Sequence, residues 1–124
     1  MRPETVLLRQ VHPNFLSGGE LTSQAFVPNS GDNNKLSVYD GDQITAEHSY
    51  THYTVSQNKQ SSGVWGLSCA DVAAVGLTSA PDPLPHFPSH ALVDFAACSE
   101  KQSRKLAKRL KSFAVARGCL YQPG

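Results

Sequence analysis

Short apolar, β-branched runs separated by turn residues dominate the first three quarters of the chain. The runs with the length and composition of strands are residues 5–11, 36–39, 64–68 and 90–95. Between the first two, the pair Gly18–Gly19 predicts a hairpin turn, with residues 21–27 as the returning strand. The pattern therefore predicts a small sheet of short strands.

Two short helices are indicated by their caps. Thr45 is a predicted N-cap for a helix over residues 46–57, with an acidic residue placed in its first turn. Ser68 is the predicted cap of a second helix, which Gly76 ends as a residue suited to positive φ.

The C-terminal helix has the clearest pattern of the chain. Ser99 and Gln102 form a capping box, and Gly118 closes the helix. Its apolar positions recur on one helical face: Leu106, Ala107, Leu110, Phe113 and Ala114.

Two segments predict irregular structure. Residues 28–35, PNSGDNNK, are turn formers and predict a surface loop, while residues 79–89 contain four prolines and exclude a regular helix or central strand. We therefore expect one compact α+β domain over residues 1–124, with a small mixed or antiparallel sheet and two to three helices.

Composition narrows the class of protein. The chain of 124 residues is 40% hydrophobic and 17% charged, which is typical of a globular domain. It has neither an apolar run long enough to span a membrane nor the pattern of a signal peptide. Three widely spaced cysteines without a C-x-x-C motif argue against a disulfide framework or structural zinc. We expect a cytoplasmic protein without a cofactor.

The net charge of +1 conceals a strong asymmetry. Residues 99–117 contain seven basic residues against Glu100 alone, and the rest of the chain is acidic. This predicts an anionic partner, either nucleic acid or an acidic protein surface, with a merely solvated helix face as the alternative. The candidate binding residues are Lys101, Arg104, Lys105, Lys108, Arg109 and Lys111.

A second candidate site combines residues from separate strands. Arg9 and His12 lie on or just after the first strand, and Ser23 lies on its predicted hairpin partner. Together with His90 they form a set that can hold a phosphate, a carboxylate or a nucleotide. The alternatives are an exposed rim and, for His90, a ring that hydrogen-bonds the proline-rich segment. Asp94 is too far along the same strand to pair with His90.

The metal-type residues do not fit known spacings. His48 and His52 share a helix face, but Ser49 stands where a zinc protease needs glutamate. Asp40 and Asp42 begin no EF-hand loop, because the required glycine and glutamate are missing further along. The sequence therefore predicts no metal site and favours turn and helix-surface roles for these residues.

Four blocks, RQVHPNF, LTSQAF, KLSVYDGD and DPLPHFPSHALVDF, resemble a set of small uncharacterised bacterial proteins. These carry Arg, Ser-x-Ala-Phe, Leu-Ser-Val-Tyr and Pro-x-His-Ala-x-Val in the same order. The resemblance implies a compact single domain and no known activity. The matching residues are Arg9, Pro13, Ser23, Ala25, Phe26, Leu36, Ser37, Val38, Tyr39, Pro88, His90, Ala91 and Val93.

A topological likeness also exists to ADP-ribosyltransferase-like folds, which have an arginine on the first strand and serines on later strands. The catalytic glutamate of those enzymes has no counterpart here, since Glu47 and Glu100 both lie at predicted helix starts.

The functional hypothesis from sequence is a non-catalytic interaction or regulatory module of a bacterial gene cassette, of the defence or toxin–antitoxin type. It would bind a protein or nucleic acid, and not a membrane, through its basic helix; homodimerisation is left open. The alternative is a small enzyme acting on a nucleotide or RNA, nuclease or ADP-ribosyltransferase-like, that uses Arg9, His12, Ser23 and His90.

Overall fold

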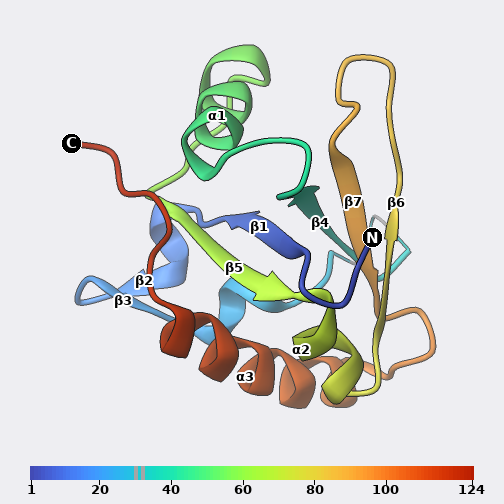
Figure 1. The fold of residues 1–124 in the computed structure, drawn as a ribbon. Coiled ribbons are helices and arrows are strands. Elements are labelled where there is room, and N and C mark those ends of the chain that lie inside the picture. Colours follow the sequence, from blue (N-terminus) through green and yellow to red (C-terminus); the bar gives the residue numbers. More distant parts are fainter. Residues whose placement is uncertain (30, 32) are drawn as a thin grey trace.

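A five-stranded antiparallel sheet in the order β5-β1-β4-β7-β6 forms the centre of the computed structural model, which describes residues 1–29, 31 and 33–124 (Figure 1). The strands are β1 (Val6–Gln10), β4 (Lys35–Asp40), β5 (Val64–Ser68), β6 (Thr78–Pro81) and β7 (His90–Asp94). Four of them confirm the predicted runs. β6 contains Pro81 and lies at the edge of the sheet, where a missing backbone donor is tolerated.

Helices cover the two faces of the sheet unequally. α3 (Glu100–Arg117) and α2 (Cys69–Ala74) lie on one face, and α1 (Ala46–Thr51) lies on the other (Figure 1). The larger core lies beneath α3, where Leu110 is fully buried. This arrangement confirms the α+β prediction, and no helix of the described residues is long and apolar enough to cross a bilayer.

The predicted helix caps are confirmed. The side chains of Ser99 and Gln102 close the capping box of α3, and Gly118 ends the helix with a φ of 88°. Ser68 caps α2 in the same manner with Asp71. The hydroxyl of Thr45 accepts the amide of residue 48 at the start of α1.

The helix predicted over residues 46–57 changes type half-way. After α1 it continues as the π-helix η4 (His52–Ser56), in which the amide of Gln57 donates to the carbonyl of His52. The hydroxyl of Thr54 donates to the carbonyl of Tyr50 at 2.8 Å, and such side-chain bonds distort a helix.

The hairpin is shorter than predicted. β2 (Leu16–Ser17) and β3 (Glu20–Leu21) flank Gly18 and Gly19, whose φ values of 58° and 83° suit a tight turn. The returning strand predicted to reach residue 27 is wrong, because Ser23–Phe26 form the 3-10 helix η2. This turn buries the consecutive residues Ala25 and Phe26 together, which the alternating faces of a strand cannot do. Residues 30 and 32 of the predicted surface loop lie outside the described residues.

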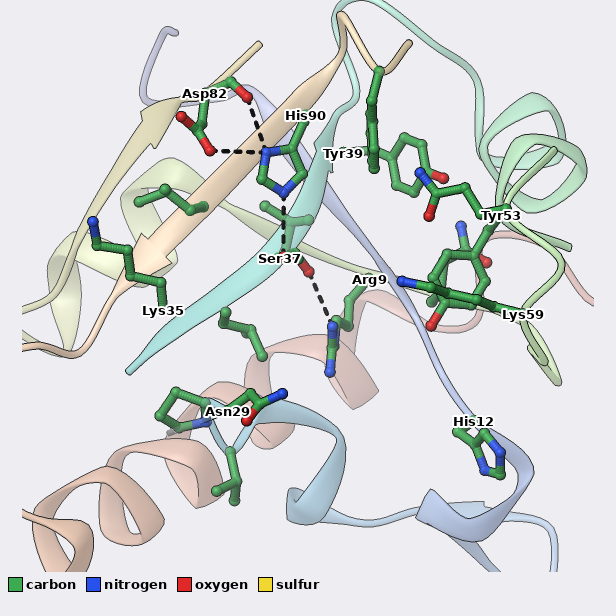
Figure 2. Close-up of a pocket in the computed structure, with 18 of the residues that line it drawn as sticks. Arg9, His12, Asn29, Lys35, Ser37, Tyr39, Tyr53, Lys59, Asp82 and His90 are labelled. Atoms are coloured by element: carbon green, nitrogen blue, oxygen red, sulfur yellow. Dashed lines mark hydrogen bonds and ion pairs between the residues drawn. The ribbon is translucent and has the colours of Figure 1, made fainter. Parts of the chain in front are cut away.

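The sheet opens between its two halves. β1 pairs with β5 over five residues, and β4 pairs with β7 over five. β1 and β4 pair only at Leu7 with Asp40 and at Leu8 with Tyr39, and then diverge (Figure 2). The backbone pairing between β1 and β4 therefore ends at Leu8. The candidate site lies in the opening beyond it.

Candidate functional site

A cavity of about 880 Å³ occupies the opening between β1 and β4 (Figure 2). β1, β4 and β7 line it together with η4 and the segment that joins β6 to β7. A cavity of this size is within the usual range for small-molecule sites.

Arg9 spans the point where the two strands separate. Its Nε donates to the carbonyl of Ala25 at 2.8 Å, and its Nη1 donates to the carbonyl of Ser37 at 3.0 Å. Burial lowers the pKa of the Arg9 guanidinium from its usual value, because desolvation disfavours the charged form. Among the described residues no carboxylate forms an ion pair with Arg9. The cavity therefore contains a half-buried cation held by neutral carbonyls.

Three polar side chains form a hydrogen-bonded row across neighbouring strands (Figure 2). His90 Nε2 lies 3.2 Å from the hydroxyl oxygen of Ser37. His90 Nδ1 lies 2.9 Å from the backbone carbonyl oxygen of Asp82 and 3.1 Å from its carboxylate. Both of these oxygens only accept, so Nδ1 carries the hydrogen and Nε2 of the neutral ring is free to accept from Ser37.

An aromatic cluster forms one wall of the cavity. The Tyr39 ring packs against Phe87, with centroids 4.4 Å apart. His52 Nε2 contacts the carbonyl of His86 at 3.0 Å and therefore donates, which leaves Nδ1 to accept from the Tyr39 hydroxyl at 2.7 Å. Burial, and secondarily Tyr53, raises the pKa of the Tyr39 phenol, which keeps it a neutral donor.

The permanent charges on the described lining residues of the cavity are mostly positive. Arg9, Lys35 and Lys59 all line it, and the Lys59 ammonium lies 5.5 Å from the centre of the Tyr53 ring. Asp82 is the only carboxylate among the described lining residues. This balance favours an anionic ligand.

The structure brings three of the four predicted pocket residues together. Arg9, His12 and His90 line one cavity, and Ser23, on η2, is not among its described lining residues. His12 Nδ1 accepts from the amide of Asn14 and caps a short 3-10 turn (η1, Pro13–Phe15).

Of the row, the sequence left the direction of Ser37 open and gave no sign of Asp82. The alternation in LSVY places Ser37 and Tyr39 on one face of β4, opposite Leu36 and Val38. Asp82 follows the last residue of β6 and extends its register with β7, since its amide donates to the carbonyl of His90 at 2.9 Å. That pairing depends on the course of the proline-rich loop.

The residues tested for metal chemistry have local roles. Asp40 accepts the amide of Asp42 in a turn, and Asp42 itself accepts from the Thr5 hydroxyl and pairs with Arg2. Within the part of the chain that the structure describes, no group of three metal-type side chains is found.

The basic helix presents most of its charges to solvent. The exposed residues are Lys101, Arg104, Lys105, Lys108 and Arg109, and Lys111 is half-buried. Arg104 pairs with Glu100 on the helix itself, at 3.2 Å. The other five form no ion pair with the described residues.

Comparison with protein-family models, with curated proteins and with solved structures found no match. The resemblance to small bacterial proteins therefore stays a prediction.

Proposed function

We propose that the cavity between β1 and β4 binds a small anionic molecule, and that nucleotides are the ligand class to test first. The observation that carries this proposal is Arg9, a half-buried guanidinium with no ion-pair partner among the described residues. A guanidinium has five N–H donors, and two of its nitrogens are engaged here by main-chain carbonyls. The remaining donors suit a phosphate or carboxylate.

The rest of the cavity supports a ligand that joins an anionic group to a flat ring. Lys35 and Lys59 line the same cavity as Arg9 and add positive charge to it. Phe15, Tyr53 and Phe87 are half-buried and line the cavity, so they supply apolar surface for a ring. Nucleotides combine both parts, which agrees with the alternative predicted from sequence.

The test is calorimetric titration of the protein with AMP, adenosine and inorganic phosphate. We expect AMP to bind more tightly than either fragment, and Arg9→Gln to weaken AMP binding by about 10-fold or more, because a charge-assisted bond is lost. Lys35→Gln and Lys59→Gln remove charge without touching the carbonyls held by Arg9, and should weaken AMP binding less. Arg117→Gln, which removes one positive charge outside the cavity lining, is the matched control. Equal binding of AMP by all these variants would overturn the proposal.

A second function is supported by the basic face of α3, defined here as Lys101, Arg104, Lys105, Lys108, Arg109 and Lys111. We propose that this face docks on an acidic protein surface or nucleic acid, as expected for an interaction or regulatory module. The supporting observation is that five of these cations have no ion-pair partner among the described residues. No aromatic side chain is interleaved with them to stack on bases.

Charge reversal tests this second function. Replacing Lys101, Arg104, Lys105 and Lys108 with glutamate should abolish partner capture and leave folding intact, since all four are exposed. Direct binding to a random-sequence DNA duplex, measured at several salt concentrations, separates the two partner classes, because phosphate contacts give a steep salt dependence. Unchanged capture by the reversed protein would exclude the basic face.

A further inference from the structure

We propose that Ser37, His90 and Asp82 form a catalytic triad that hydrolyses a carboxylic ester of a small anionic molecule. The anionic character of the substrate rests on the proposed function of Arg9, whereas the triad stands on its own geometry. Ser37 is the nucleophile, His90 is the base, and Asp82 is the positioning residue.

The triad follows from the register of three neighbouring strands. His90 on β7 lies opposite Tyr39 on β4, so Ser37 is its diagonal neighbour on the same face of the sheet. On the other side, Asp82 continues the β6–β7 pairing directly beside His90. The pairing of the strands therefore places the Ser37 hydroxyl, the His90 imidazole and the Asp82 carboxylate in a row. All three residues belong to the part of the chain that the structure describes.

The hydrogen bonds set the direction of proton transfer. Nδ1 of His90 must donate, because its partners at 2.9 and 3.1 Å are a carbonyl and a carboxylate oxygen of Asp82. The lone pair of Nε2 then points at the Ser37 hydroxyl, 3.2 Å away. This is the tautomer and orientation that a general base for serine requires.

The nucleophile is reachable and has a cation beside it. Ser37 is exposed at the cavity, while His90 is 8% exposed and its ring packs against Phe87 with centroids 4.7 Å apart. On the opposite side of Ser37, the Arg9 guanidinium contacts the Ser37 carbonyl (Figure 2). A positive charge at this place stabilises both an anionic substrate group and developing negative charge on the attacked ester.

The reaction uses only the ester and water. Oγ of Ser37 bonds to the ester carbonyl carbon as its proton moves to His90 Nε2; the bond to the leaving oxygen then breaks, and that oxygen takes the proton from His90. A water molecule next gives a proton to His90, and the oxygen of this water bonds to the acyl carbon. The acyl–Ser37 bond breaks, and Oγ regains the proton from His90. An alcohol and a carboxylic acid leave.

The first experiment is labelling of the folded protein with a neutral alkyl fluorophosphonate, with the modified residue located by mass spectrometry. We expect modification of Ser37 in the native protein and none in Ser37→Ala or in urea. His90→Asn keeps a donor toward Asp82 but removes the acceptor for Ser37, so labelling should slow by about 100-fold or more. Asp82→Asn should slow it less, because the Asp82 carbonyl still holds Nδ1. Ser112→Ala is the control, since Ser112 is an exposed serine whose hydroxyl donates to a carbonyl of its own helix.

If the hydrogen bonds of Ser37, His90 and Asp82 only stabilise the fold, the labelling experiment gives a different result. In that case His90→Asn lowers stability but Ser37 is labelled no faster than Ser112, and the triad is overturned. Labelling of Ser37 that is equally fast in His90→Asn overturns it as well.

A pair of esters distinguishes failure of the triad from failure of the anion site. Hydrolysis of neutral 4-nitrophenyl acetate depends on the triad, and the preference for the anionic 4-nitrophenyl hemisuccinate depends on Arg9. Arg9→Gln should reduce hydrolysis of the hemisuccinate by about 10-fold more than hydrolysis of the acetate. If both esters are hydrolysed with no preference, the triad holds and the anionic substrate is wrong. If neither ester is hydrolysed, the triad is overturned, whether or not the protein binds AMP.

Discussion

Nη1 of Arg9 lies 3.0 Å from the backbone carbonyl oxygen of Ser37, a position that the β1–β4 register would assign to the amide of Gln10. A side chain therefore replaces a ladder hydrogen bond at the point where the sheet opens. The same guanidinium also satisfies the carbonyl of Ala25. Arg9 is thus a structural residue as well as the proposed anion-binding residue.

Arg9→Met should therefore lower the free energy of unfolding by about 1–3 kcal/mol, because two main-chain carbonyls lose their donor. Arg9→Lys, which keeps one donor group, should cost less. Urea denaturation measures both, with Arg109→Met on the exposed face of α3 as a control expected to change stability by about 0.5 kcal/mol or less. Equal stability of Arg9→Met and wild type would show that water replaces Arg9 at no cost.

Tyr39 gives a prediction for alkaline pH. Its folded-state pKa is raised, so above about pH 10 the unfolded chain releases a phenol proton that the folded chain retains. The stability contributed by Tyr39 is therefore complete below the unfolded pKa and is lost as pH rises toward the folded pKa. Absorbance titration should show one of the four tyrosines ionising only on unfolding. In Tyr39→Phe that component should disappear; its persistence would assign it to another tyrosine.

Asp42 gives the matching prediction for acid. The Thr5 hydroxyl and then Arg2 lower the pKa of its carboxyl, so its contribution is present above the unfolded pKa and is lost as pH falls through the folded pKa. Asp42→Asn should therefore flatten the acid side of the stability curve. Glu47→Gln, an exposed change on the neighbouring helix, is the control. Identical acid profiles for Asp42→Asn and wild type would exclude this contribution.

Much of the fold could be predicted because its signals are local. The box at Ser99 and Gln102, the cap at Ser68 and the apolar face of α3 each depend on residues a few positions apart. The prediction of a returning strand was wrong because Ala25 and Phe26 are buried together by contact with α3. No local sequence pattern encodes that contact.

The site was predicted only in part for the same reason. The chemical types of Arg9, His12 and His90 singled them out, but Ser23 was placed by a strand that does not form. Asp82 could not be found, since its contact with His90 follows from the path of the proline-rich segment. Where two strands separate is a tertiary property, and the sequence of β1 alone gives no sign that its pairing with β4 stops at Leu8.

Gly41 offers a test of packing at the closed end of the opening. A Cβ at this position would collide with the backbone carbonyl oxygen of Val6, to which the Gly41 amide also donates. We expect Gly41→Ala to lower the free energy of unfolding by about 3 kcal/mol, since backbone cannot move aside as a side chain can. Gly76→Ala meets no atom and has only a positive φ of 83°, so it should cost about 1 kcal/mol. Equal costs in thermal unfolding would contradict the predicted collision.

The narrow junction between β1 and β4 has a consequence for the motions of the molecule. Two strand pairs and the Gly41–Val6 hydrogen bond join the halves of the sheet, so the seam should open more readily than the five-pair ladders on either side. A molecule bound between Arg9 on one half and His90 on the other would act as a removable cross-link. Amide hydrogen exchange of β1 and β4 should then slow together on ligand binding, and a compound screen could detect occupants by that change before their chemistry is known.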